Sequence, residues 1–439
     1  MHANANIQRK ISRCCFTPPD FAFKLLSYTK TKDYSSMRIL LIAILLGLFS
    51  QSHAATAVSL APLVSGQTLT IESDILNEKR EVTIYLPKNY NAQTRYHTLY
   101  ILDAEHYFEQ AIGVISALRN TRKIPNVILI GVKTKIRVRD YLPPLQGPAQ
   151  GRMQSHITKH FPEFGSAPRF AQFLEDELIP WVERNYTVHP TRTLVGHSNA
   201  GVFGMHLLFN QPALFANYLL ASPAPWWSRA QISQLVAQFK NSGSTRHANL
   251  FLTLGEQESQ GYYAYMMNLS AQLHSHTPAG LRWQFKIMPG EDHSSIVFPS
   301  MLSGLPFLYQ ELIYPDLEET AKYGEIANIQ TYFDTLSKRD ATLYLAPQST
   351  LADLAHMQFE YDRNTQAMAT LNYFTTLYPE SAYAHQSLGL GHMKMAQYSQ
   401  AIVSFNTALS LLDANHIEDQ TVSDFLNEMV TTATKKLSL

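Results

Sequence analysis

The stretch GHSNAG (residues 196–201) places Ser198 where a short apolar run gives way to a helical pattern. A strand, a tight turn and a helix in this order form a nucleophile elbow, which exposes a serine hydroxyl at the end of a sheet. The last position of the G-x-S-x-G pattern is Ala200 here, with Gly201 directly after it. An unactivated hydroxyl is a poor nucleophile, so the sequence must also supply a base and a group that orients the base.

Candidates for these two partners follow Ser198 in the order acid, then histidine. The strand-like run NLFLTLG (residues 249–255) opens into EQES, which puts Glu256 and Glu258 at the carboxyl end of a strand. His293 follows in PGEDHSS, in a loop between an expected strand and an expected helix. We expect His293 to take the serine proton and pass it to the leaving alcohol. One of the two glutamates would fix the tautomer of the imidazole.

Backbone N–H groups are expected to hold the oxyanion that forms when a serine attacks an ester. Asn199, directly after the serine, would supply one N–H at the start of the helix. The loop after LYILD would supply a second, from Ala104 or Glu105. In this hypothesis the donors come from segments that are far apart in the sequence.

Four further side chains are candidates for contacts with a substrate. Trp226 and Trp227 in SPAPWW could line a pocket for an acyl or aromatic group, or pack in the core beneath a lid. Arg137 and Arg139 could meet an anionic substrate such as a ferric catecholate, or pair with Asp140 and neighbouring acids. Both alternatives stay open for each pair.

Other kinds of chemistry lack their usual residues. The chain has no H-E-x-x-H motif and no cysteine cluster, so a catalytic zinc ion has no evident ligand set. It also has no G-x-x-x-x-G-K-[ST] loop to bind phosphate. Lys plus Arg and Asp plus Glu balance at 35 each, without the basic excess typical of nucleic-acid partners. We therefore expect no metal, no cofactor and no nucleic acid.

Alternating strand and helix patterns would position the candidate residues. Several apolar runs are nearly continuous, as in strands buried on both faces of a parallel sheet. Between them lie helical patterns, clearest in PRFAQFLEDELIPWVERNY (residues 168–186), where apolar residues recur at helical spacing. This alternation predicts an α/β-hydrolase fold with a doubly wound, mostly parallel sheet. The strand-like runs are residues 80–87, 97–103, 126–132, 191–196, 217–223 and 249–255.

The first part of the chain has the pattern of an export signal. Residues 37–54 combine one arginine, an apolar run and small residues before a cleavage site, which predicts a signal peptide. The apolar run is too short to span a bilayer comfortably, although a signal anchor is the alternative. Residues 1–36, which contain both cysteines, would then be a non-native extension ahead of a true start at Met37. The mature protein is expected to be periplasmic or secreted, without a stable membrane span.

The character of the sequence changes after residue 314, where helical patterns replace strand-like runs. A period of 34 residues and the placement of small and large residues resemble the tetratricopeptide pattern, chiefly at Leu388, Gly389, Tyr398, Ala401, Phe405 and Ala408. We therefore predict three parts after the signal peptide: a hydrolase domain over 55–314, a helical connection over 315–344 and a small all-α domain of tetratricopeptide-like repeats over 345–439.

These motifs resemble the putative esterase (esterase D-like) branch of the α/β-hydrolases, which includes siderophore esterases of the enterobactin type. The likeness extends from residue 69 to residue 314 and rests on REVTIYLPKNY, LYILDAEHYF, RVRDYLP, GHSNAG and PGEDHSS. The segment RVRDYLP is typical of the siderophore-esterase-like members. By this resemblance Ser198 is the nucleophile, His293 the base and Glu258 the acid, with Glu256 as the fallback.

Three functions follow from these observations. The first is a serine hydrolase that cleaves small-molecule carboxylic esters through an acyl-enzyme, with siderophore-type esters among its candidate substrates. The second is an acyltransferase, in which an alcohol replaces water at the same acyl-enzyme. The third is a non-catalytic binding module whose helical repeats bind a protein or peptide. That third function predicts loss of a catalytic position, whereas Ser198, His293 and a glutamate are all present.

Overall fold

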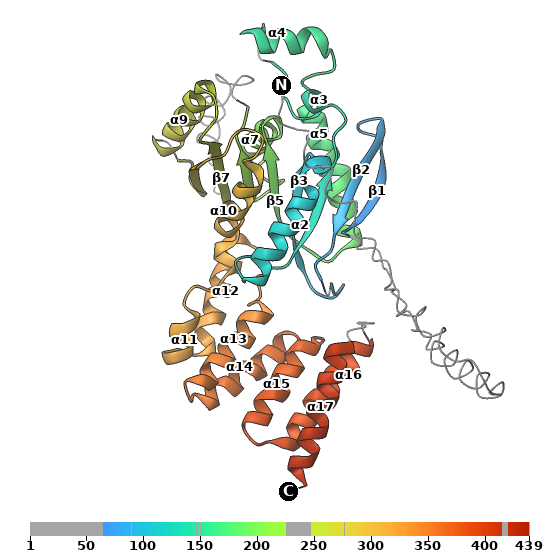
Figure 1. Ribbon diagram of the computed structural model, residues 1–439, viewed down its shortest axis with the longest axis vertical. Coiled ribbons are helices and arrows are strands. Elements are labelled where there is room, and N and C mark those ends of the chain that lie inside the picture. The colour runs from blue at the N-terminus through green and yellow to red at the C-terminus, as the bar shows by residue number, and fades with distance from the viewer. Residues whose placement is uncertain are drawn as a thin grey trace, which may run out of the picture. The chain divides into compact units, whose positions relative to one another are not determined.

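The computed structural model describes residues 65–438 except 89, 146–147, 150, 225–246, 276 and 415–419. The predicted signal peptide, the N-terminal extension, Trp226 and Trp227 lie outside the described residues. An eight-stranded sheet with helices on both faces forms the centre of the hydrolase domain (Figure 1). This arrangement confirms the predicted α/β-hydrolase fold. None of the helices formed by the described residues is both long enough and apolar enough to cross a membrane.

The strands of the sheet follow the order β1-β2-β4-β3-β5-β6-β7-β8. Strands β3 to β8 run parallel, whereas β2 pairs antiparallel with both β1 and β4. The carboxyl ends of the parallel strands therefore meet at one edge, where open α/β sheets bind their ligands. The bounds are β1 Gln67–Ser73, β2 Glu78–Tyr85, β3 Tyr96–Leu102, β4 Val127–Val132, β5 Val188–His197, β6 Asn217–Ala221, β7 Ala248–Gly255 and β8 Leu281–Met288.

The six strand-like runs of the sequence correspond to β2 through β7, and β8 is the strand expected before His293. Strand β1 is absent from the predicted strands. It lies at the edge of the sheet, and most of its residues are exposed or half-buried. A strand that buries few side chains needs few apolar residues, so its sequence gives only a weak strand signal. Pairing with β2 then determines its position.

Two apolar cores lie on the two faces of the sheet, because successive side chains of a strand point to opposite faces. On β3, Tyr100 and Leu102 pack in one core, while Leu99 and Ile101 pack in the other. Helices α5, α6, α7 and α9 contribute to the first core, and α2 and α10 to the second. The helices of this domain are α2 Ala104–Asn120, α3 Arg137–Asp140, α4 Gly151–His160, α5 Ala167–Phe173, α6 Ile179–Asn185, α7 Asn199–Asn210, α9 Gln260–Ser275 and α10 Val297–Tyr309.

The helix predicted over residues 168–186 is present but changes its pitch midway. It consists of α5, a π-helical turn at Leu174–Leu178, and α6. Pro180 follows this turn, and proline has no N–H to donate to the carbonyl four residues earlier. Phe170 and Phe173 are fully buried against the sheet, as the helical spacing predicts.

The region that follows the hydrolase domain is helical in its described residues. Helix α15 begins 34 residues after α13, and α16 begins 34 residues after α14, so the helices repeat with the predicted period. A Cβ atom at Gly389 would lie 2.5 Å from the Phe405 ring, so the close approach of α15 and α16 requires glycine there. The tetratricopeptide-like assignment stays a prediction. The helices are α11 Leu317–Tyr323, α12 Ile326–Asp340, α13 Gln348–Glu360, α14 Asn364–Leu377, α15 Ala382–Lys394, α16 Tyr398–Ala414 and α17 Gln420–Leu437.

Three stacked rings connect the helical region to the amino ends of two central strands. His97 on β3 and His189 on β5 have ring centroids 4.2 Å apart, and the Tyr344 ring stacks on His189 at 5.9 Å. Because these are the amino ends of parallel strands, the contact lies at the edge of the sheet opposite to the carboxyl ends.

Protonation of His189 should weaken the fold in mild acid. Burial, and after it the charge of Arg95, lower the pKa of His189 to about 4, against about 6.5 in an unfolded chain. The unfolded state binds more protons between these values, so the free energy of unfolding falls as the pH drops through this window. In urea titrations, the free energy of unfolding should fall between pH 7 and pH 4 by roughly 2 kcal/mol more in the wild type than in His189→Gln. Equal losses in the two proteins would contradict this linkage.

Candidate active site

Ser198 lies on a strained turn between β5 and α7. Its backbone has φ 59° and ψ −114°, a conformation that residues other than glycine adopt at a cost of about 1–3 kcal/mol. A Cβ atom at Gly196 would lie 2.5 Å from the Ala200 carbonyl oxygen, so only glycine allows the helix to start this close to the strand. The Ser198 N–H donates to the Ala221 carbonyl of β6 at 3.0 Å. Strand packing and this hydrogen bond together hold the turn.

Three polar side chains form a continuous hydrogen-bonded chain after β5, β7 and β8. The Nε2 atom of His293 lies 3.0 Å from the Ser198 Oγ, and its Nδ1 atom lies 2.8 Å from Oε1 of Glu258. The Glu258 side chain is only 3% exposed. A carboxylate facing Nδ1 keeps the proton of a neutral imidazole on that nitrogen, which leaves Nε2 to accept the serine proton. The three residues named from the sequence are therefore brought together.

The two glutamates that the sequence offered as alternatives have different partners. Glu258 faces His293, whereas Glu256 is exposed and its Oε2 atom accepts the Gly290 N–H at 2.8 Å. The N–H of Glu256 also donates to the Met288 carbonyl at 3.1 Å. Glu256 therefore fastens the loop after β7 to the loop after β8, and Glu258 is the residue in position to orient the imidazole.

A short turn fixes the loop that carries His293. Oδ1 of Asp292 accepts hydrogen bonds from the N–H groups of Ser294 at 2.8 Å and Ser295 at 2.9 Å. The bonds from Ser295 and then Ser294 lower the pKa of the Asp292 carboxyl. Because an ionised carboxylate accepts hydrogen bonds best, this turn restrains the backbone directly around the imidazole.

The segments expected to stabilise an oxyanion begin two helices on adjacent parallel strands. Asn199 opens α7 after β5, and Ala104 opens α2 after β3, with one residue between the strand and the helix in each case. Both residues are buried, whereas Glu105 is exposed. No hydrogen bond within the described ranges engages the N–H of any of these three residues. Helix amino ends with unpaired N–H groups carry partial positive charge, which suits a developing oxyanion.

Three aromatic side chains around His293 and its neighbour His197 were not singled out from the sequence. The Tyr107 hydroxyl is 3.0 Å from Nδ1 of His197, and the His197 ring lies 4.6 Å from the His293 ring. Burial, and after it the neighbouring His293, lower the pKa of His197 to about 3, which leaves it neutral near pH 7. The Tyr262 ring lies 4.9 Å from the His293 ring, and burial followed by the Glu258 charge raises the pKa of Tyr262 to about 12. His197 lies in GHSNAG and Tyr107 in LYILDAEHYF, whereas Tyr262 lies outside the quoted motifs.

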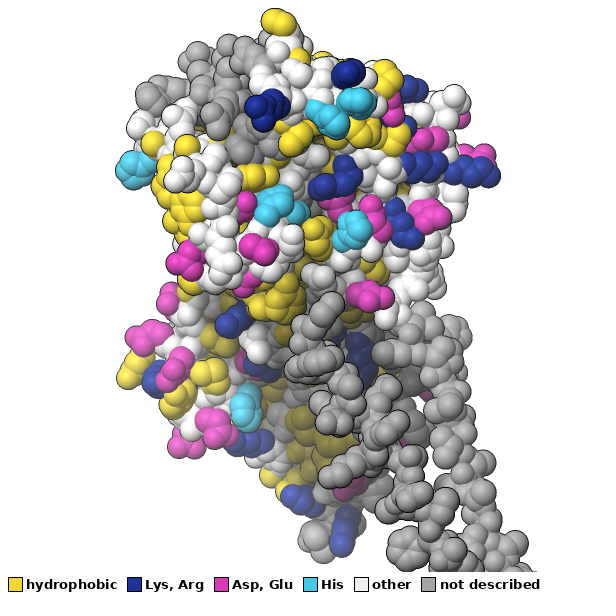
Figure 2. Space-filling view, turned by 45° about the horizontal axis from the view of Figure 1, so that its top comes forward, with side chains coloured by type: hydrophobic (Ala, Val, Ile, Leu, Met, Phe, Trp, Pro, Cys, Tyr) yellow, Lys and Arg dark blue, Asp and Glu magenta, His cyan; other side chains and the backbone are white. Residues whose placement is uncertain are grey.

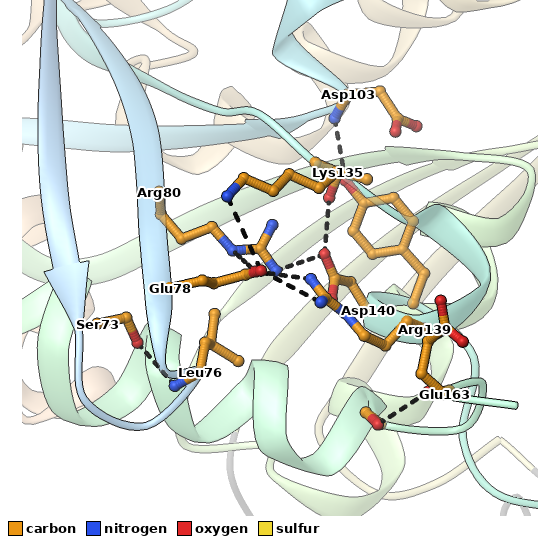
Figure 3. A network of polar contacts seen from close by, with 12 residues as sticks. Ser73, Leu76, Glu78, Arg80, Asp103, Lys135, Arg139, Asp140 and Glu163 are labelled. Atoms are coloured by element: carbon orange, nitrogen blue, oxygen red, sulfur yellow. Dashed lines mark hydrogen bonds and ion pairs between the residues drawn. The ribbon is translucent and has the colours of Figure 1, made fainter.

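Arg139 lies in a network of ion pairs rather than at a substrate position (Figure 3). Its Nη2 atom is 2.6 Å from Oε1 of Glu78, and its Nε atom is 2.7 Å from Oδ1 of Asp140. Arg80, which is 1% exposed, approaches the same two carboxylates at 2.8 and 2.6 Å. Lys135 is a third cation in this network, with its Nζ atom 3.9 Å from Oε2 of Glu78, so each of the two carboxylates has cationic partners, as largely buried charges require.

Arg137 lies beside the nucleophile turn. Its Nε and Nη2 atoms donate to the two carboxylate oxygens of Asp103, each at 2.9 Å. The Nη2 atom also donates to the His197 carbonyl at 3.2 Å. Burial raises the pKa of the Asp103 carboxyl, and Arg137 opposes that rise. The Arg137 side chain remains 37% exposed, so it is paired and also reaches solvent.

Helix α4 carries exposed basic side chains and shares an apolar cluster with Ala224. Its Ile157 packs in one apolar cluster with Ala224, whose N–H donates to the Ser198 carbonyl. Arg152 and Lys159 are exposed, and the helix has no acidic residue. Figure 2 shows Lys, Arg and His side chains gathered on the upper face of the molecule, where α4 lies. Within the part of the chain that is described, no group of three or more His, Cys, Asp or Glu could hold a metal ion.

Comparison with known proteins gives a consistent match over the sheet and its helices. The model of a family described as Putative esterase matches residues 73–297, about half of the chain. The ferri-bacillibactin esterase BesA of Bacillus subtilis (strain 168) is 29% identical over 241 residues, which cover 50% of this chain and 82% of BesA.

Solved structures share the fold. An IroE-like serine hydrolase from Shewanella oneidensis has a TM-score of 0.60 at 26% identity, over 70% of this chain and 99% of that structure. An uncharacterised protein from Capnocytophaga ochracea DSM 7271 has a TM-score of 0.56 at 14% identity, over 84% of this chain and 99% of that structure. The second likeness shows the fold alone.

The strain at residue 198 can be measured by comparing two substitutions that both remove the hydroxyl. Ser198→Gly relieves the backbone strain, whereas Ser198→Ala keeps a Cβ atom in the same conformation. We expect Ser198→Gly to be more stable than Ser198→Ala by about 1 kcal/mol, after allowing for the greater chain entropy of glycine. Urea unfolding at pH 7 measures this difference. An alanine variant as stable as the glycine variant would show that the turn is unstrained.

Proposed function

The chain belongs to the Putative esterase family and is therefore a carboxylic ester hydrolase, and we propose that Ser198, His293 and Glu258 hydrolyse the ester through an acyl-enzyme. The observation that carries this proposal is the unbroken hydrogen-bonded chain from the Glu258 carboxylate through the imidazole to the serine hydroxyl. Each of the three follows a strand of the same parallel sheet. The substrate is then a small-molecule ester that reaches this edge of the sheet.

The reaction would proceed in two halves. In the first, Nε2 of His293 takes the Ser198 proton while Oγ bonds to the ester carbonyl carbon, whose oxygen becomes an oxyanion. The N–H groups of Asn199 and of Ala104 or Glu105 stabilise that charge. The bond to the alcohol then breaks, the alcohol takes the proton from His293, and an acyl-serine remains. In the second half, water attacks the acyl carbon by the same proton route and releases the acid.

For the substrate, we propose an anionic ester of the siderophore type. BesA is named a ferri-bacillibactin esterase, and the match covers most of that protein. Arg152 and Lys159 are exposed on α4, and Ile157 of the same helix packs in one apolar cluster with Ala224. Ferric catecholates are negatively charged, so this positive rim would attract them over a long range.

Two further assignments follow from the sequence. The pattern of residues 37–54 supports a periplasmic or secreted location for the mature protein. The proposed catalytic residues all lie within the hydrolase domain, so we assign the repeats over 345–439 to binding a protein or peptide partner. Neither assignment affects the chemistry at Ser198.

Ser198→Ala and His293→Ala should each lower kcat on p-nitrophenyl butyrate by at least about 10⁴-fold, because neither can form the acyl-enzyme efficiently. A fluorophosphonate probe should label the wild type and leave Ser198→Ala unlabelled. Free acid should remain the main product when a competing alcohol is added. Labelling of Ser198→Ala would reject this nucleophile, and preferential formation of a new ester would favour acyl transfer.

The two glutamates provide a matched pair of substitutions. Glu258→Gln should lower kcat by about 10²–10⁴-fold, because an amide cannot stabilise the imidazolium and can select the wrong tautomer. Glu256→Gln keeps an oxygen acceptor for the Gly290 N–H and should retain activity close to the wild type. The opposite pattern, an active Glu258→Gln with an inactive Glu256→Gln, would reverse the assignment of the acid.

The positive rim can be tested by charge reversal on α4. Arg152→Glu with Lys159→Glu should lower kcat/KM for an iron-loaded catecholate trilactone by about tenfold at low salt, and less at high salt. Hydrolysis of the neutral p-nitrophenyl ester should stay unchanged. Lys435→Glu on α17 is the control, because that residue lies far along the chain in the repeat region. Equal effects on both esters would reject an electrostatic role for α4 in recognition.

A further inference from the structure

We propose that Arg137 is a positioning residue that holds together the two backbone segments of the oxyanion site. This inference rests on the proposed acyl-enzyme mechanism. The sequence offered Arg137 as a ligand for an anionic substrate or as an ion-pair partner, and the contacts favour a third role. Its guanidinium group bonds to Asp103, directly after β3, and to the carbonyl of His197, directly before the reacting serine.

The two partners of Arg137 lie one and two residues before the proposed N–H donors Ala104 and Asn199. Asp103 follows β3 and precedes Ala104, whereas His197 ends β5 and precedes Ser198. The Nη2 atom of Arg137 lies 2.9 Å from Oδ2 of Asp103 and 3.2 Å from the His197 carbonyl oxygen. A single nitrogen atom therefore connects the turn that starts α2 with the turn that carries the nucleophile.

The turn at Asp103 needs external support. Its backbone has φ 53° and ψ 44°, in the left-handed region, where a residue other than glycine pays about 1 kcal/mol. The residue is 1% exposed, and its N–H donates to the buried Tyr141 hydroxyl at 3.2 Å. Without Arg137 the buried Asp103 carboxylate would lose its bidentate partner. A different backbone conformation of the turn, in which the carboxylate reaches water, would then become favourable.

Such a movement would change catalysis more than substrate binding. The N–H groups of Ala104 and Glu105 follow Asp103 directly, so their directions depend on this turn. Oxyanion donors act on charge that develops in the transition state, so misalignment lowers kcat and leaves KM nearly unchanged. Complete loss of one donor typically lowers kcat by about 10²–10³-fold, and we expect a loss of about 10- to 100-fold in Arg137→Ala.

Arg139 provides a matched control on the same short helix. It lies two residues after Arg137, and its bonds go to Glu78 and Asp140 rather than to the strand ends beside the serine (Figure 3). Arg139→Ala should therefore lower the midpoint of thermal unfolding while the kcat of the folded enzyme stays close to the wild type. Both variants lose a guanidinium group from the same helix. A difference in kcat between them therefore shows the effect of the contacts that Arg137 alone makes.

The experiment measures kcat and KM on p-nitrophenyl butyrate and the inhibition constant of an aryl boronic acid, whose serine adduct mimics the tetrahedral intermediate. In Arg137→Ala we expect kcat and boronate affinity to fall by similar factors at nearly constant KM. Added guanidinium should restore part of the activity of Arg137→Ala. Arg137→Lys should stay impaired, because an ammonium group cannot make the bidentate bond. Asp103→Asn should lower kcat similarly, and combining it with Arg137→Ala should add little.

Three outcomes would overturn the inference. One is an Arg137→Ala variant whose KM rises for the anionic trilactone alone, since Arg137 would then bind substrate. Another is a loss of thermal stability with unchanged kcat, since the role would then be structural only. The third is full additivity of Arg137→Ala and Asp103→Asn. If Arg137→Ala fails to fold, Arg137→Lys and Asp103→Asn provide the same comparison. An active Ser198→Ala would instead reject the proposed function.

Discussion

The hydrogen bond between His293 and Ser198 is the contact on which the proposed chemistry depends. The two residues are far apart in the chain, and the distance of 3.0 Å between Nε2 and Oγ exists because both follow strands of one parallel sheet. Parallel strands end at a common edge, so loops from β5, β7 and β8 can meet there without any long excursion. The sheet fixes the direction in which each loop starts. Local hydrogen bonds such as those at Asp292 then restrict the conformation of the loop itself.

The surroundings of the imidazole also restrict its charge. His197 lies 4.6 Å from His293, and a second positive charge at that distance would oppose protonation of the base during the reaction. Burial prevents this by lowering the pKa of His197 to about 3. Glu258 contributes in the opposite sense, because a negative charge against Nδ1 favours the imidazolium. A neutral neighbour on one side and an anion on another together favour proton transfer from Ser198.

Residues with strong local signals were predictable from the sequence, and residues whose roles depend on loop geometry were not. Ser198 follows an apolar run, His293 follows an expected strand, and the two occur in the order that the fold requires. Glu256 and Glu258 lie two positions apart after the same strand, so only the path of the loop separates them. The 34-residue period was visible in the sequence, and the starts of α13 and α15 and of α14 and α16 are separated by that number of residues.

The roles of the two arginines of RVRD were also not predictable from the sequence. Residues two apart on a helix point about 200° apart around its axis, so Arg137 and Arg139 face different surroundings despite their common motif. Arg139 enters an ion-pair network, and Arg137 connects Asp103 with His197. Tyr107 lies in LYILDAEHYF but contacts His197 only in the folded chain, and Tyr262, outside the quoted motifs, approaches His293 from α9.

Trapping of the acyl-enzyme tests the central claim most directly. The protein would be mixed with a slowly deacylating p-nitrophenyl ester, quenched in acid within the first turnover, and analysed by intact and peptide mass spectrometry. The account predicts that the chain gains the mass of one acyl group and that this group maps to Ser198. Turnover without any covalent adduct, or an acyl group on another residue, would contradict it.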